Sequence, residues 1–210
     1  MVFLTEELVF PSPNLASNEG IVAFGGDLSP ERLLLAYKSG IFPWFEEGSP
    51  IIWWSPDPRM VLFPEELKIS KSLKKTLKDE VFQVTHNKAF KEVVINCASI
   101  KRKSQKGTWI THDMVEAYNQ LFKLKHAVSV EVWQENTLVG GLYGVDLGTV
   151  FCGESMFSKV PNASKVGFVH LVNTLQNNNY RLIDCQVYTE HLASLGAHEI
   201  SREAFLSYLK

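Results

Sequence analysis

The sequence has few cysteines, and their arrangement indicates neither a disulfide scaffold nor a metal site. Only Cys97, Cys152 and Cys185 occur among the 210 residues, far apart and in apolar or mixed surroundings. An odd number of separated cysteines without a Cys-x-x-Cys pair argues against disulfides and against a zinc site. The six histidines show no ligand spacing either. We therefore expect reduced thiols, a cytoplasmic location and no bound metal.

Long apolar runs and phosphate-binding loops are also missing. No run reaches the roughly 18–20 residues that span a bilayer, and the N-terminus lacks the basic and apolar stretches of a secretory signal. The glycines of Gly25-Gly26-Asp27 and Gly140-Gly141 lack the full glycine-plus-lysine pattern of a phosphate loop. We expect no membrane span, no secretion and no phosphate loop at these glycines.

The net charge of −2 conceals a strong asymmetry along the chain. Residues 1–57 carry two basic and eight acidic residues, a net charge of −6, whereas residues 67–106 carry eleven basic and three acidic residues, a net charge of +8. Such a local excess indicates a polyanionic partner, although a solvated charged face would have the same composition. The basic side chains fall into two groups, one made of Lys71, Lys74, Lys75 and Lys78 and the other of Lys101, Arg102, Lys103 and Lys106.

The distribution of proline predicts two domains. Eight of the nine prolines lie in the first 64 residues, and Ser55-Pro56-Asp57-Pro58 marks a boundary. We expect a small, loop-rich N-terminal domain over residues 1–57 and a larger second domain over residues 58–210. The first domain contains one clear helix, which begins with Ser29 as N-cap and Pro30 at the first helical position and ends at Gly40.

The remaining residues predict an α+β domain. Helical periodicity covers residues 71–78, 112–125 and 163–176, and Ser201 caps a last short helix; alternating or apolar runs predict strands over residues 128–133, 138–145, 150–157 and 180–187. Three antiparallel strands, a helix, a further strand and a closing helix resemble the second half of a GNAT-like acyltransferase domain, with a mixed, largely antiparallel sheet and flanking helices. Residues 158–164 contain no glycine, which argues against coenzyme A as the acyl donor.

Two apolar segments carry polar side chains that indicate a site. The first delivers Glu154 to a bend, and a helix is predicted to start near Asn162. A helix N-terminus leaves backbone N–H groups unpaired, which suits a phosphate or a reacting carbonyl. The second segment carries Asp184 and Gln186 two residues apart, so we expect both side chains on one face of a strand.

Ten motifs, in order, cover nearly the entire chain. They are Phe10–Pro13, Ala23–Pro30, Gly40–Phe45, Trp53–Arg59, Gly107–Ile110, Gly140–Val145, Gly153–Ser158, Asn162–Lys165, Ile183–Gln186 and Ala193–Ala197. Through these motifs the sequence resembles the leucyl/phenylalanyl-tRNA–protein transferase family. One such motif would be weak support, whereas ten collinear motifs are specific.

The resemblance implies a cytoplasmic enzyme of the bacterial N-degron pathway. Such an enzyme transfers Leu or Phe, and Met less well, from aminoacyl-tRNA to the α-amino group of a protein that begins with Arg or Lys. The donor ester is already activated, so no ATP, metal or other cofactor is implied. We expect a monomer, because no exposed apolar helix stripe stands out. The two basic groups would bind tRNA phosphates.

The resemblance also implies a substrate-binding site. Phe42, Trp44, Leu142 and Met156 would form an apolar slot for the Leu or Phe side chain, although Phe42 and Trp44 could instead be core between the two lobes. Trp109 would stack on the terminal adenosine, or pack under the following helix. The remaining substrate-binding candidates are Ser158 and Asn162, which would hold the ribose or phosphate, and Tyr118 on the helix predicted over residues 112–125.

Three residues are catalytic candidates. Glu154 and Asp184 would recognise the positive side chain and amine of the acceptor, unless either is a structural salt bridge. Gln186 would hold the amine while Asp184 orients it and favours loss of its proton; assistance from a tRNA ribose hydroxyl is the alternative. Two other functions stay open: a GNAT-like transferase with another activated acyl donor, and a non-catalytic module that binds tRNA or protein N-termini.

Overall fold

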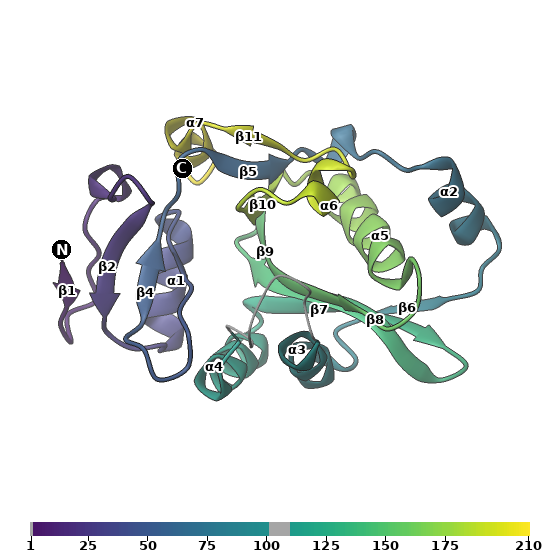
Figure 1. Ribbon diagram of the computed structural model, residues 1–210, viewed down its shortest axis with the longest axis horizontal. Coiled ribbons are helices and arrows are strands. Elements are labelled where there is room, and N and C mark those ends of the chain that lie inside the picture. Colours follow the sequence, from purple (N-terminus) through teal and green to yellow (C-terminus); the bar gives the residue numbers. More distant parts are fainter. Residues whose placement is uncertain (1, 101–109) are drawn as a thin grey trace.

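A four-stranded sheet and one helix form the N-terminal part of the molecule (Figure 1). The computed structural model describes residues 2–100 and 110–210. The strand order is β1-β2-β4-β3, with β1 at Phe3–Leu4, β2 at Ile21–Gly25, β3 at Phe42–Pro43 and β4 at Ile52–Trp54. The sequence predicted only loops and a helix here. Strands of two to five residues are too short to show a period, which is why they were missed.

Helix α1 (Pro30–Lys38) begins and ends as predicted. The Ser29 side chain accepts a hydrogen bond from the Arg32 N–H, which caps the first turn. Gly40 follows the helix with a φ of +75°, a left-handed conformation that favours glycine.

A seven-stranded sheet organises the rest of the chain. Its order is β11-β5-β10-β9-β8-β7-β6, and every neighbouring pair is antiparallel except β9 and β10. The strands are β5 (Arg59–Leu62), β6 (Gln83–His86), β7 (Ala127–Gln134), β8 (Thr137–Asp146), β9 (Val150–Ser158), β10 (Leu182–Gln186) and β11 (His198–Ile200). The predicted mixed, largely antiparallel sheet is confirmed.

Helices cover both faces of this sheet, α3 and α4 on one and α5 on the other (Figure 1). The helices are α2 (Lys71–Lys78), α3 (Phe90–Ser99), α4 (His112–Lys123), α5 (Ala163–Asn177), α6 (Glu190–Ala193) and α7 (Arg202–Ser207). The predicted cap Ser201 accepts from the Ala204 N–H, and Ser70 caps α2 in the same way by accepting from the Leu73 N–H. Helix α3 was missed. Among the described residues, no helix is long and apolar enough to cross a membrane.

The sheet opens between β9 and β10. Their parallel ladder ends where Asp184 faces Cys152, although β9 continues to Ser158 and β10 to Gln186. The ladder between β10 and β5 is irregular at the same place, and Gln186 has a φ of +65°. The last residues of both strands are therefore released from pairing with each other and line an opening through the sheet.

Candidate active site

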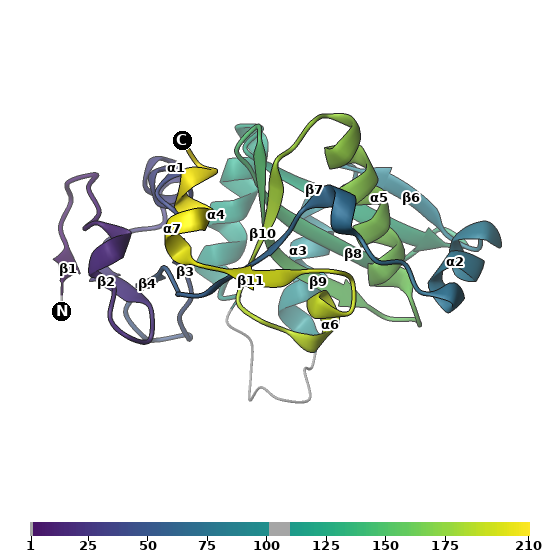
Figure 2. The same cartoon turned by 90° about the horizontal axis from the view of Figure 1, so that it is seen from above.

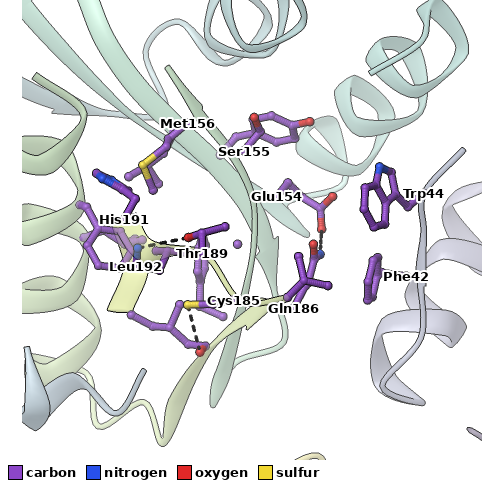
Figure 3. A pocket seen from close by; sticks show the side chains of 18 of the residues that line it. Phe42, Trp44, Glu154, Ser155, Met156, Cys185, Gln186, Thr189, His191 and Leu192 are labelled. Carbon is purple, nitrogen blue, oxygen red and sulfur yellow. Dashed lines mark hydrogen bonds between the residues drawn. The ribbon is translucent and has the colours of Figure 1, made fainter. Parts of the chain in front are cut away.

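A cavity of about 390 Å³ lies at the opening between β9 and β10. Most of its wall is apolar and includes Leu142, Phe151, Met156, Phe168, Leu171 and Ile183. The polar side chains of Glu154 and Gln186 also line it, with Phe42 and Trp44 of the N-terminal part of the chain beside them (Figure 3). Figure 3 shows Met156, His191 and Leu192 on the other side of this polar pair. The cavity thus combines an apolar slot with a polar end.

Glu154 is a buried carboxylate at the polar end, with 8% of its surface exposed. It accepts hydrogen bonds from Tyr37 Oη (2.7 Å), Tyr118 Oη (2.8 Å) and Gln186 Nε2 (3.0 Å). Burial raises the pKa of Glu154 to about 7, and the nearby charge of Asp184 adds to the rise, while the three hydrogen bonds oppose it. This carboxylate therefore gains and loses its proton nearer to neutral pH than an exposed glutamate does.

The two tyrosines come from different parts of the chain. Tyr37 lies on α1 and Tyr118 on α4, and their hydroxyl oxygens also lie within hydrogen-bond distance of each other. Burial and the neighbouring Glu154 carboxylate raise the pKa of both phenols well above the usual value, so both stay protonated. Each phenol has one proton to donate, so both can donate to Glu154 only when neither donates to the other. Tyr118 does not line the cavity, and its contact with Glu154 ties it to the site.

The sequence analysis did not assign Tyr37 to the site. The available signal was a tyrosine on the buried face of a helix, because a buried phenol needs a hydrogen-bond partner.

Asp184 lies behind the cavity wall instead of lining it. Arg59 at the start of β5 binds both carboxylate oxygens, Nε to Oδ1 at 2.7 Å and Nη2 to Oδ2 at 2.6 Å, and both side chains are 1% exposed. The prediction that Asp184 contacts the acceptor amine does not fit this geometry. The alternative raised from the sequence, a salt bridge, is what the structure contains.

Arg59 was missed although its motif was recognised. A single arginine opens the apolar strand Met60–Leu62, and a buried guanidinium needs an acidic partner. That combination was the signal in the sequence.

Gln186 lines the cavity at the site expected for it, but not through simple strand alternation. Its backbone N–H donates to Asp184 Oδ1 (2.9 Å), and its side-chain Nε2 donates to Glu154. A left-handed φ is uncommon for glutamine and costs free energy, so these contacts hold a strained residue.

The other predicted substrate residues divide into two groups. Phe42, Trp44, Leu142 and Met156 all line the cavity. Ser158 and Asn162 do not: the Ser158 hydroxyl donates to the Val160 carbonyl and accepts from the Ser164 N–H, and Asn162 donates to Thr76. They stabilise the turn into α5 and its contact with α2.

The basic groups can be placed only in part. Lys71, Lys74, Lys75 and Lys78 are exposed on α2, opposite the buried Leu73. The predicted positions Trp109, Lys101, Arg102, Lys103 and Lys106 lie outside the described residues. Within the described ranges, no three His, Cys, Asp or Glu side chains come together as a metal site would require.

Comparison with known proteins gives matches across the chain. The family model for leucyl/phenylalanyl-tRNA protein transferase matches residues 61–210, and the model for the N-terminal domain of that transferase matches residues 26–57. The leucyl/phenylalanyl-tRNA–protein transferase of Flavobacterium johnsoniae is 62% identical over 210 residues, which cover 100% of this chain and 99% of the relative. That of Flavobacterium psychrophilum is 59% identical over 100% of both chains. The Shigella dysenteriae protein of the same name is 55% identical over 96% of this chain and 86% of its own.

Proposed function

This chain belongs to the leucyl/phenylalanyl-tRNA protein transferase family, and we propose that it transfers Leu or Phe, and Met less well, from aminoacyl-tRNA to the α-amino group of proteins that begin with Arg or Lys. The enzyme is an aminoacyltransferase. The product would carry an N-terminus that the N-degron pathway degrades, in the cytoplasm. The observation that carries the proposal is an apolar cavity that ends at a buried carboxylate.

The apolar part of the cavity would take the aminoacyl side chain. Leu142, Phe151, Met156 and Phe168 form walls without hydrogen-bonding groups at their tips, which suit Leu and Phe. Met156 is unbranched and can adapt to either shape. Such a slot would reject Ile and Val by shape but separate Leu from Met only weakly, since a methylene-scale difference is worth about 1–3 kcal/mol.

The polar end would hold the acceptor. Glu154 would bind the positive side chain of an N-terminal Arg or Lys when ionised, and Gln186 would hold the α-amine. Gln186 uses Nε2 on Glu154, and no described residue hydrogen-bonds to its Oε1, which can accept from the amine. Asp184 would act from behind the wall, through the Gln186 backbone.

The reaction requires the neutral amine to attack the ester carbonyl. The new C–N amide bond forms as the ester C–O bond breaks, and the ribose hydroxyl leaves with a proton. The proton that the α-ammonium loses beforehand would pass to Glu154, whose pKa of about 7 lies near neutrality, or to solvent. The ribose hydroxyl next to the ester remains the alternative proton carrier.

The tRNA would bind through the basic groups and the predicted adenosine contacts. The exposed lysines of α2, with Lys101, Arg102, Lys103 and Lys106, would contact phosphates, and Trp109 would stack on the adenine. Phosphate contacts do not depend on base sequence, so different tRNA bodies would be accepted. We propose a monomer with an N-terminal domain over residues 1–57 and a catalytic domain over residues 58–210.

Labelled Leu-tRNA incubated with an Arg-initiated peptide tests the function. We expect label to appear on the peptide, and none on the same peptide with an acetylated α-amine. Binding of tRNA without transfer would indicate a non-catalytic module. Acylation of the peptide only from another activated donor would indicate a different GNAT-like transferase.

A further inference from the structure

Arg59 connects three separate parts of the molecule at one buried guanidinium. Besides the two bonds to Asp184, its Nη1 donates to the Gly40 carbonyl at 3.3 Å. The guanidinium lies 4.8 Å from the ring centroid of Phe42 and 4.5 Å from that of Phe205 on α7. The α1–β3 connection, β10 and α7 therefore meet at this side chain.

Only an arginine can make this set of contacts. Its planar guanidinium pairs with a carboxylate through two parallel N–H groups and stacks on aromatic faces, whereas a lysine ammonium does neither in the same way. Because both partners are 1% exposed, the pair is shielded from water and holds its geometry.

Two of the contacts lead directly to the cavity. Asp184 Oδ1, held by Arg59 Nε, also accepts from the Gln186 N–H and so supports the left-handed backbone of Gln186. The ring of Phe42, beside the guanidinium, lines the cavity next to Gln186 (Figure 3). One side chain therefore positions a residue of β10 and a residue of the N-terminal domain that face the same space.

We propose that Arg59 is a positioning residue for the transfer reaction, which acts through Asp184 on the Gln186 carboxamide and through stacking on Phe42. Arg59 itself does not touch the substrates. This inference rests on the proposed function and adds to it a residue that sets the distance between the two sides of the polar end.

Arg59→Lys keeps the charge and removes the two-point pairing. We expect kcat for transfer to an Arg-initiated peptide to fall about 10–100-fold, because a misplacement of about 1 Å has effects of this size. The KM for Leu-tRNA should stay within about twofold, because the basic residues that would bind tRNA lie elsewhere. Circular dichroism and thermal unfolding show whether the variant is folded.

Asp184→Asn separates positioning from general destabilisation. If Arg59 acts through Asp184, the double variant Arg59→Lys/Asp184→Asn should lose no more kcat than the worse single variant, because the two residues form one unit. Additive losses in the double variant would overturn the inference.

Arg32→Lys is the matched control. Arg32 is 0% exposed and binds Asp27 Oδ2 (3.0 Å) and the carbonyls of Thr5 and Glu7, so it is also a buried, paired arginine. Its side-chain hydrogen bonds go to Asp27, Thr5, Glu6 and Glu7, and none of these residues lines the cavity. We expect Arg32→Lys to lower thermal stability while kcat stays within about twofold of the wild type.

The outcomes separate this inference from the proposed function. A wild-type protein that transfers no Leu contradicts the function itself. Active wild type with a folded Arg59→Lys of unchanged kcat contradicts only the positioning role. If Arg59→Lys does not fold, Phe205→Leu replaces it, since that change removes one stacked ring and leaves the ion pair; we then expect a fall in kcat of about threefold, and an unchanged kcat would overturn the inference.

Discussion

At the scale of the residue, Glu154 shows how burial changes the pKa of a carboxyl group. Its carboxylate is removed from water but surrounded by the three donors of Tyr37, Tyr118 and Gln186. Burial outweighs those donors, so the pKa rises to about 7. The carboxylate can therefore gain or lose a proton within the physiological range, unlike an exposed glutamate.

The pKa of Glu154 predicts how stability depends on pH. The folded value of about 7 is above the ordinary 4.5, so the folded state binds this proton more tightly than the unfolded state does. The stabilisation is complete below about pH 4.5 and is lost as pH rises through 7. We expect the wild type to lose about 2–3 kcal/mol of unfolding free energy from this group between pH 5 and pH 8.

Glu154→Gln should remove this dependence, because an amide does not titrate. Urea unfolding at pH 5 and pH 8, followed by tryptophan fluorescence, measures the difference between wild type and variant. Glu116→Gln changes an exposed glutamate and serves as the control. Its unfolding free energy should depend on pH as that of the wild type does. Equal pH dependence in Glu154→Gln and the wild type would contradict the raised pKa.

At the scale of the element, α2 is a short helix with two distinct faces. Leu73 is 1% exposed and packs in the core with α5, while Lys71, Lys74, Lys75 and Lys78 are exposed. Ser70 caps the first turn, and Lys75 and Lys78 lie in the last turn, where positive charge is favourable. These lysines do not build the core, so they can be changed without disturbing it.

Replacing the four α2 lysines by alanine should weaken tRNA binding and its dependence on salt. Each phosphate contact contributes about 0.7–0.9 to the slope of log affinity against log salt concentration, so the slope should decrease by about 3. Filter binding at several salt concentrations measures it.

Lys91→Ala is the control for this prediction, since Lys91 is exposed but pairs with Glu116 on α4. For Lys91→Ala, the slope of log tRNA affinity against log salt concentration should match that of the wild type. An unchanged slope in the α2 variant would show that these lysines face solvent and not tRNA.

At the scale of the whole molecule, the site depends on contacts between distant parts of the chain. Phe42, Trp44 and Tyr37 belong to the N-terminal residues, whereas Glu154 and Gln186 belong to the large sheet. Seen from above, α7 lies over the region of α1 and β3 (Figure 2). A methyl group at Gly40 would meet Leu206 of α7, so the turn after α1 and the C-terminal helix pack closely.

Gly40→Ala and Gly48→Ala together measure this packing. Both glycines have a φ near +75°, at +75° and +77°. Apart from the residues adjoining Gly48, no described residue has an atom within 4 Å of the position of a Gly48 methyl. We expect Gly48→Ala to cost about 1 kcal/mol, the penalty of the left-handed conformation. Gly40→Ala should cost at least about 2 kcal/mol, because overpacking against α7 is added.

Thermal or urea unfolding of both variants gives the comparison. Gly40→Ala should also lower transfer, since Gly40 accepts from Arg59 and lies two residues before Phe42. Equal destabilisation by the two changes would show that the contact with α7 relaxes without cost.

Much of the fold could be predicted because its signals are local. Ser29, Ser70 and Ser201 are N-cap residues that indicate where helices start. The change to a hydrophobic period of two at Ala127 indicates the antiparallel strands β7, β8 and β9. The short strands of the N-terminal domain, β6 and β11 carried no such period. They exist because neighbouring strands pair with them, not because of their own pattern.

The candidate site was predicted only in part. Glu154, Gln186, Phe42 and Met156 line one cavity, as the family resemblance implied. The partner of Asp184 could not be inferred, because alternation along a strand says which face a side chain occupies but not what lies across from it.

The sequence by itself determined the helix caps, the strand periods and the polar residues that interrupt apolar strands, since these depend on neighbours a few residues away. Only the tertiary structure decided that Arg59 pairs with Asp184, 125 residues along the chain, and that Tyr37 donates to Glu154, 117 residues away. A buried charge or hydroxyl must find a partner, but which partner it finds depends on how the sheets and helices pack around it.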